Sequence, residues 1–111
     1  MIKSRPKKRD WRLARKKLED EQVCRVCRRV PSGSFQDRLE AAHIIARRHD
    51  QDVVVNPLHI IPLCTMCHLE YDARKLEILP FLTPNEQGEN TRIAGGSIHF
   101  LKRVSPLGGE W

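Results

Sequence analysis

Two matched pairs of cysteines constrain the fold of this chain more than any other feature of its sequence. Cys24 and Cys27 form one Cys-x-x-Cys pair, Cys64 and Cys67 form a second, and 36 residues lie between the pairs. Zinc takes four thiolates in a tetrahedron, and each pair can supply two of them. The spacing therefore predicts one structural zinc site with a folded segment between its two halves. Because four thiolates leave no open coordination position, this zinc is expected to support the fold only.

The second pair also fits the pattern that attaches c-type haem, since His68 directly follows Cys67. Haem attachment requires export and leaves Cys24 and Cys27 without a role, so we favour zinc. The first ten residues, MIKSRPKKRD, lack the apolar stretch of a signal peptide, and no apolar run is long enough to span a membrane. We therefore expect a cytoplasmic protein with no membrane contact, in which reduced thiols bind metal instead of forming disulfides.

The basic residues are concentrated at the N-terminal end. Residues 1–29 contain 12 Lys and Arg against 4 Asp and Glu, whereas residues 30–111 contain 8 against 10. This asymmetry predicts a polyanionic partner, most simply nucleic acid; the alternative is a solvated basic tail. Trp11, Ala14 and Leu18 recur at helical spacing, which predicts a basic amphipathic helix over residues 9–21. Its cations are expected to contact phosphates without reading the base sequence: Arg12, Arg15, Lys16 and Lys17.

The length of 111 residues suits one domain with a modest core. We divide it into a basic arm and helix (1–22), a core (23–78) and a helical tail (79–111). Residues 38–45 resemble a short strand, which places Leu39, Ala41 and His43 on one face and Glu40, Ala42 and Ile44 on the other. A second apolar stretch, residues 53–64, is interrupted by Asn56-Pro57 and by Pro62. A helix is expected from about Thr65 to about Lys75.

The tail carries a helix-start signal. Thr83 fits the N-cap, Pro84 the first helical position, and Glu86 the third residue of a capping box. Gly95-Gly96 is expected to end this helix. A last short helix or extended segment is expected over residues 98–104.

Three histidines stand near the second cysteine pair or in the strands that lead to it. His43 and His59 each lie in an apolar segment, and His68 follows Cys67. Strand pairing would allow the three side chains to converge. His68 and Asp72 are four residues apart, so they share one helical face and can grip a divalent ion; a solvated or capping pair is the alternative.

The segments LEAAHII and NPLHIIPLCTMCHLEYD together resemble the HNH endonuclease motif, over residues 24 to about 76. The segment LTPNEQGENTRIAGGSIHFLKR resembles the tail of small bacteriophage-type HNH proteins. The resemblance implies an α+β fold: a small ββα-metal, treble-clef-like domain, stapled by the four-cysteine zinc site and flanked by helices.

The resemblance also implies residue roles. His43 matches the general base that activates water, His68 a ligand of the catalytic metal, and Asp72 a further ligand in some members. His59 stands where the family has the asparagine that orients the base, and Ala42 stands where many members have a metal-binding Asp or His. The catalytic metal, which could be Mg²⁺, Mn²⁺, Ni²⁺ or Zn²⁺, would then be held by His68 and Asp72, with help from His59 or Glu40.

Three functions are consistent with these features. The first is a metal-dependent endonuclease that nicks DNA, acting as a monomer or weak dimer; the phage-like tail implies a place beside genome packaging, with terminase proteins as partners. The second, motivated by Ala42 and His59, is a non-catalytic zinc-stapled DNA-binding module. The third is a zinc-dependent protein-interaction domain, which would not bind DNA even at low salt.

Overall fold

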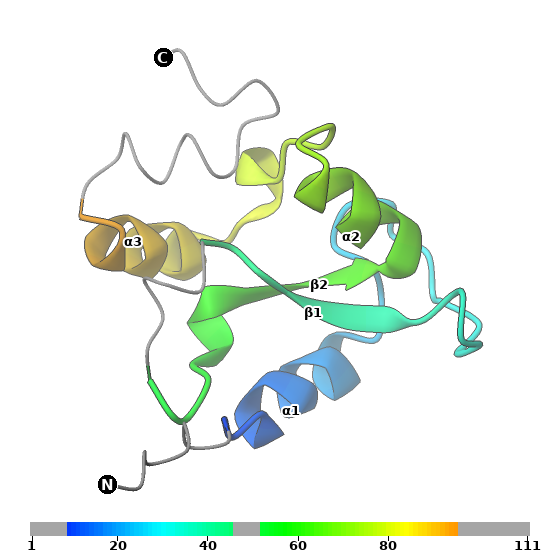
Figure 1. Cartoon of the computed structure of the whole chain (residues 1–111), viewed down its shortest axis with the longest axis horizontal. Coiled ribbons are helices and arrows are strands. Elements are labelled where there is room, and N and C mark those ends of the chain that lie inside the picture. The colour runs from blue at the N-terminus through cyan, green and yellow to red at the C-terminus, as the bar shows by residue number, and fades with distance from the viewer. Residues whose placement is uncertain (1–8, 46–51, 96–111) are drawn as a thin grey trace, which may run out of the picture.

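The computed structural model of the chain describes residues 9–45 and 52–95. These residues form a mixed α+β domain in which helices surround a two-stranded antiparallel sheet (Figure 1). The elements in chain order are α1 (Arg12–Glu21), β1 (Leu39–His43), η2 (Pro57–His59), β2 (Ile60–Cys64), α2 (Thr65–Asp72), η3 (Leu79–Phe81) and α3 (Pro84–Ile93). None of the helices within the described ranges is long and apolar enough to cross a membrane. The segment expected over 98–104 lies outside the described residues.

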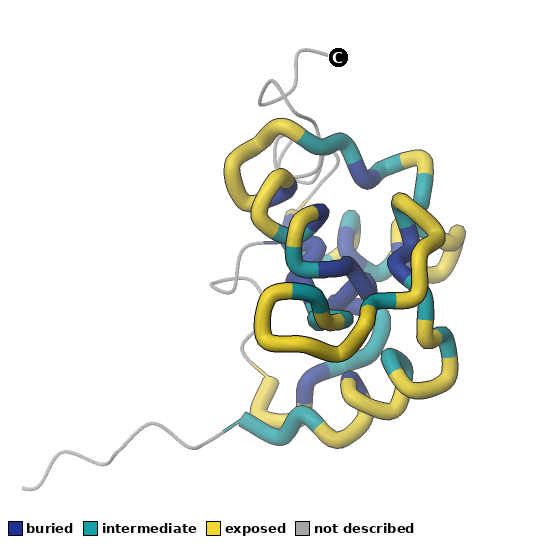
Figure 2. The backbone as a smooth tube through the Cα atoms, turned by 90° about the vertical axis from the view of Figure 1, so that its right-hand side faces the viewer, coloured by how far each residue is buried: buried dark blue, intermediate teal, exposed yellow. Residues whose placement is uncertain are grey.

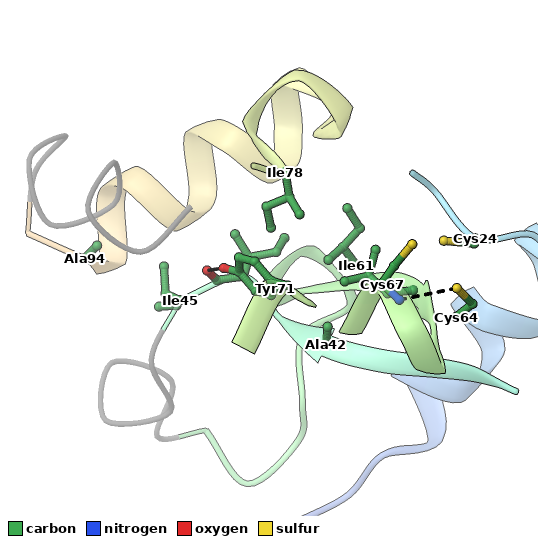
Figure 3. Packing of buried hydrophobic residues seen from close by; sticks show 11 residues of the cluster. Cys24, Ala42, Ile45, Ile61, Cys64, Cys67, Tyr71, Ile78 and Ala94 are labelled. Atoms are coloured by element: carbon green, nitrogen blue, oxygen red, sulfur yellow. Dashed lines mark hydrogen bonds between the residues drawn. The ribbon is translucent and has the colours of Figure 1, made fainter. Parts of the chain in front are cut away.

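The sheet is covered on both faces because its side chains alternate between them. On one face, Ala41 packs with Ile60 and with Ala14 of α1. On the other face, Ala42 and Ile61 belong to the main apolar cluster, which α2 enters through Tyr71 (Figure 3). The hydroxyl of Tyr71 donates a hydrogen bond of 2.5 Å to the Ile44 carbonyl oxygen. The buried backbone is therefore gathered at the centre of the domain (Figure 2).

The interruption expected at Pro62 does not occur, because β2 runs through it. In the register of the sheet, Ala42 faces Ile61 and Ala41 faces Pro62. The Ile44 amide donates to the His59 carbonyl oxygen at 2.9 Å, so residues 41 and 62 form a non-hydrogen-bonded pair of the antiparallel ladder. The nitrogen of Pro62 thus points away from β1, and its missing N–H costs no ladder bond. Its carbonyl oxygen points the same way and accepts from the Arg25 amide at 2.9 Å.

The helix boundaries follow local signals. Helix α3 has the expected capping box between Thr83 and Glu86, with Pro84 in the first turn, and Gly95 follows it at a φ of 75°. Helix α2 ends at Asp72, not near Lys75, because Arg74 adopts a left-handed φ of 59°. Helix α1 begins at Arg12, later than expected, because Asp10 instead pairs with the backbone of residues 53–55.

A buried ionic network joins α1, the first cysteine pair and α3. The carboxylate of Glu86, whose side chain is 2% exposed, accepts from the Arg25 guanidinium at 2.8 and 3.1 Å and also pairs with the Lys17 ammonium. Arg25 also binds Glu21 at the end of α1 and the Phe81 carbonyl oxygen in η3. The network fixes α3 against the segment that carries Cys24 and Cys27.

Candidate metal centre and histidine site

The four cysteines form one cluster, as their spacing predicts. Their sulfur atoms all lie within 4.8 Å of one another, and Cys24, Cys64 and Cys67 are buried while Cys27 is exposed. The first pair is shaped by a tight turn, in which Cys24 exchanges backbone hydrogen bonds with Arg28 and Arg29. In the second pair, Cys64 is the N-cap of α2, and its sulfur accepts from the Cys67 amide at 3.5 Å (Figure 3). Four thiols in such a group can hold a structural metal ion, and they suit zinc by number and softness.

Local hydrogen bonds prepare one of these thiols for metal binding. Burial alone would raise the pKa of Cys24, but backbone hydrogen bonds from Cys64, Cys27 and Val26 outweigh it and lower the pKa to about 7. Burial raises the pKa of Cys67, and its hydrogen-bond contact with Cys64 raises it further. A metal binds thiolates, so the lowered pKa of Cys24 favours binding there, whereas binding at Cys67 must displace a proton.

A second group of polar side chains lies between β1 and α2. His68, in the first turn of α2, contacts the Glu40 carboxylate through Nδ1 at 2.7 Å, and its Nε2 lies 3.5 Å from an Asp72 oxygen. The other Glu40 oxygen accepts from Arg38 at 3.0 Å and lies 3.3 Å from the Thr65 hydroxyl. His68 and Glu40 are partly exposed, so the group is open to solvent. Glu40 was predicted only as an auxiliary ligand, whereas in the structure it is the partner nearest to the His68 ring.

The Glu40 carboxylate is held in its charged form. Burial alone would raise its pKa, but hydrogen bonds from His68 and Arg38 outweigh this effect, and the pKa of Glu40 lies below its ordinary value. Glu40 and Asp72 contact different ring nitrogens of His68, so the three side chains form a row of contacts and do not surround a common position. Across residues 9–45 and 52–95, only the cysteines bring three or more potential ligand atoms within 4.8 Å of one another. A catalytic metal at His68 and Asp72 therefore stays a prediction.

The three histidines do not lie on one face of the sheet. His43, in register with Ile60, belongs to the face that α1 covers, and its ring meets that of Trp11 edge-on at 5.5 Å. Its side chain is buried, with 8% of the residue exposed. His68 contacts Glu40 on the opposite face. Because side chains alternate along β1, His43 and His68 lie on opposite faces of the sheet and do not converge as predicted.

His59 is directed toward α3. It is buried, and its Nε2 lies 2.9 Å from a Glu89 carboxylate oxygen, which also receives Arg92. Hydrogen bonds from Arg92 and His59 lower the pKa of Glu89 to about 2, so this partner of His59 is an anion at neutral pH. The backbone of His59 stays close to that of β1, since its carbonyl oxygen accepts from Ile44. The sequence did not indicate Glu89, because the pairing depends on how α3 docks.

The basic residues expected to contact phosphates are placed differently from one another. Arg12 is exposed beside Asp10, Lys16 lies 3.6 Å from Asp20 at the surface, and Arg15 is exposed. Lys17 is held inside: its ammonium donates to the Pro57 and Ile60 carbonyl oxygens at 2.7 and 2.9 Å and pairs with Glu86. This placement argues against a phosphate contact for Lys17, whose charge is already compensated. The side chains of Arg12, Arg15 and Lys16 are exposed, so phosphates can reach them.

The fold and the site define a class: a small α+β domain with a four-cysteine cluster able to hold a metal, and a separate imidazole–carboxylate group beside it. Searches against protein-family models, curated proteins and solved structures find no match to this chain.

Proposed function

We propose that this chain is a metal-dependent endonuclease of the HNH type that hydrolyses DNA phosphodiester bonds and nicks one strand at a time. The observation that supports the proposal is the contact between Glu40 and His68, which joins the strand and the helix of the HNH-like segment. With Asp72 on the second ring nitrogen, a partly exposed set of one imidazole and two carboxylates stands beside the cysteine cluster. In this proposal the cysteine cluster holds the structural metal, and Glu40, His68 and Asp72 hold the metal that takes part in hydrolysis.

The chemistry requires charge stabilisation at phosphorus and a proton acceptor for water. A divalent ion bound at this set would stabilise a nonbridging phosphate oxygen and the departing 3′ oxygen. Glu40 stays ionised because of its hydrogen bonds, so it favours a cation there. His43 supplies the imidazole that takes a proton from water at neutral pH. Exposed cations on α1, such as Arg12 and Arg15, supply contacts to phosphates that do not depend on base sequence.

The strand sets a condition on this mechanism. Glu40 and His43 are three residues apart on β1, which corresponds to roughly 10 Å along a strand, and they point to opposite faces. A phosphate must therefore lie across the edge of β1 for both groups to act on it. The mechanism therefore requires the His43 ring to turn from Trp11 toward that edge.

A second candidate, a non-catalytic zinc-stapled DNA-binding module, is favoured by the same placement. His43 is buried against Trp11, and His59 contacts the Glu89 carboxylate. In that function the cysteine cluster holds the fold, and the exposed cations of α1 bind phosphates.

The test is nicking of supercoiled plasmid DNA by the zinc-loaded protein with Mg²⁺, Mn²⁺, Ni²⁺ or Zn²⁺ added. We expect wild type to nick, and His68→Ala and Glu40→Gln to lose nicking with every ion. His43→Ala should lower the rate about 10²- to 10⁴-fold, the range for a general base. Glu70→Gln, an exposed change on α2, is the matched control and should nick like wild type.

Binding measured by gel shift separates the two candidates. If wild type binds plasmid DNA but nicks it with none of the four ions, the non-catalytic module is correct. If His43→Ala nicks at the wild-type rate while His68→Ala does not, the endonuclease uses another proton acceptor. Zinc content and circular dichroism of each variant confirm that the fold is intact.

A further inference from the structure

The loop between the first cysteine pair and β1 presents an exposed aromatic ring. Phe35 is 82% exposed, the highest value among the exposed large hydrophobic residues in the described part of the chain. The loop projects beyond the start of β1, to the right of α2 in Figure 1. A single exposed apolar side chain is ordinary, so the surroundings of the ring must decide whether it has a function.

The loop is held in a defined turn. Asp37 receives the Arg29 guanidinium through both carboxylate oxygens, at 2.6 and 2.7 Å, and accepts from the Ser32 amide at 2.9 Å. Its carbonyl oxygen accepts from Gly33 at 2.8 Å, and Gly33 has the positive φ of 87° that such a turn requires. The ring of Phe35 is therefore carried on a braced turn, which reduces the entropy lost when a ligand binds to it.

Arg38 connects this ring to the histidine site. Its guanidinium carbon lies 5.4 Å from the centre of the Phe35 ring, and its Nε donates to Glu40 at 3.0 Å. The backbone of Arg38 also exchanges hydrogen bonds with the Thr65 hydroxyl at the start of α2. The aromatic ring, the guanidinium and the Glu40–His68 contact thus form a continuous row across three segments of the chain.

The composition of the loop indicates the kind of ligand. The exposed residues next to Phe35 in the sequence are polar or cationic: Ser32, Ser34, Gln36 and Arg38. Val30, 66% exposed, is the other large apolar side chain exposed in this loop, and a protein that covers it together with Phe35 is the alternative that the test must exclude. An aromatic face flanked by arginines fits a nucleotide: the base stacks on the ring, and the phosphate pairs with a cation.

We propose that Phe35 and Arg38 form a stacking platform for an unpaired base of a DNA strand whose phosphate lies at the Glu40–His68 site. The inference rests on the proposed function and deepens it. A base inside a continuous duplex is covered on both faces, so the platform selects single-stranded, flapped or branched DNA. Phe35 contacts the substrate base, and Arg38 holds the ring beside the site and contributes charge.

Binding without cleavage tests the platform. A labelled 20-nucleotide single strand and the matching 20-base-pair duplex are titrated with zinc-loaded protein, with no other divalent ion added. We expect Phe35→Ala to weaken binding of the single strand at least about 5-fold, the low end for loss of one stacked base. Duplex binding should change less than about 2-fold. Phe35→Trp should restore single-strand binding, because it keeps a stacking face.

Leu13→Ala is the matched control, since Leu13 is an exposed apolar residue on α1 that offers no aromatic face. It should leave both affinities unchanged. Equal single-strand affinity of wild type and Phe35→Ala would overturn the platform, as would an equal loss on single strand and duplex. Absence of DNA binding by wild type would overturn it as well.

The outcome is distinct from that of the proposed function. If wild type nicks plasmid DNA and Phe35→Ala binds the single strand as tightly as wild type, the protein is an endonuclease without the platform. A protein that nicks nothing but shows the Phe35-dependent preference for single strands has the platform without the chemistry.

Discussion

Replacement of Glu86 by glutamine is the strongest test of what holds α3 to the rest of the domain. The side chain is 2% exposed, and it accepts two hydrogen bonds from Arg25, one from the Thr83 amide and an ion pair from Lys17. The side chains of Lys17 and Arg25 are themselves only 13% and 10% exposed. The variant removes the carboxylate that contacts both cations, and the amide NH₂ of the new glutamine is a donor that faces Lys17 or Arg25.

The expected loss follows from this geometry. Removal of one partner from a buried ion pair costs about 3–5 kcal/mol, and here Lys17 is left without an anion while Arg25 keeps Glu21. At roughly 4 °C or more per kcal/mol for a domain of this size, the midpoint of thermal unfolding should fall by at least about 12 °C. Glu19→Gln, an equal charge change at an exposed position of α1, is the control and should shift it little.

The pH dependence gives a second measurement. Burial alone would raise the pKa of Glu86, but hydrogen bonds from Arg25 and Lys17 outweigh it and lower the pKa below its ordinary value of 4.5. A lowered pKa in the folded state means that the carboxylate stabilises the fold above pH 4.5 and loses this effect as the pH falls below it. The stability difference between wild type and Glu86→Gln should therefore shrink in acid.

Urea unfolding of zinc-loaded protein, followed by circular dichroism, measures the loss at pH 7. The same titration at pH 4 measures the pH effect, provided that native mass spectrometry shows the zinc still bound there. A difference of less than about 1 kcal/mol between Glu86→Gln and Glu19→Gln at pH 7 would refute the reasoning. It would show that solvent, and not Glu86, compensates the two cations.

Three further outcomes are expected. Native mass spectrometry should find one zinc per chain, and Cys67→Ser should lose it. Zinc removal by a chelator should abolish cooperative unfolding, because the free energy of zinc binding by four thiolates is comparable to the whole stability of a small domain. Tyr71→Phe should lower the free energy of unfolding by about 1–3 kcal/mol, since the buried Ile44 carbonyl oxygen loses its donor, and urea titration measures it. Thr83→Ala should cost about 1 kcal/mol through loss of the capping box, with Thr91→Ala, inside the same helix, as the comparison in the same titration.

The features that sequence predicts best are those whose cause is local. The Cys-x-x-Cys pairs place two ligands in one turn, so the cysteine cluster is confirmed, and Thr83 and Glu86 satisfy each other within one helical turn. The alternation along β1 is likewise local, and it places Ala41 and Ala42 on opposite faces as expected.

The features that sequence missed depend on distant partners. Lys17 looked like a phosphate ligand because its neighbours are basic, and only the docking of α3 brings Glu86 to it. The contact of His59 with Glu89 likewise depends on the docking of α3, and the predicted role of His59 beside His43 stays a prediction. Pro62 was interpreted as a break because the orientation of its nitrogen depends on the register with β1. In each case the partner lies on an element whose position the local pattern does not determine.

The position of Arg25 between two cysteines has a consequence for the order of events during synthesis. All four cysteines precede Glu86 in the chain, and Arg25 and Glu86 are 61 residues apart. A nascent chain can therefore capture its metal while Arg25 and Lys17 are still hydrated. We expect the docking of α3 to be the last step. It removes water from Lys17 and Arg25 and at the same time brings Glu89 to His59. We therefore expect the newly made protein to pass through a metal-loaded stage in which α3 is still open to chaperones and proteases.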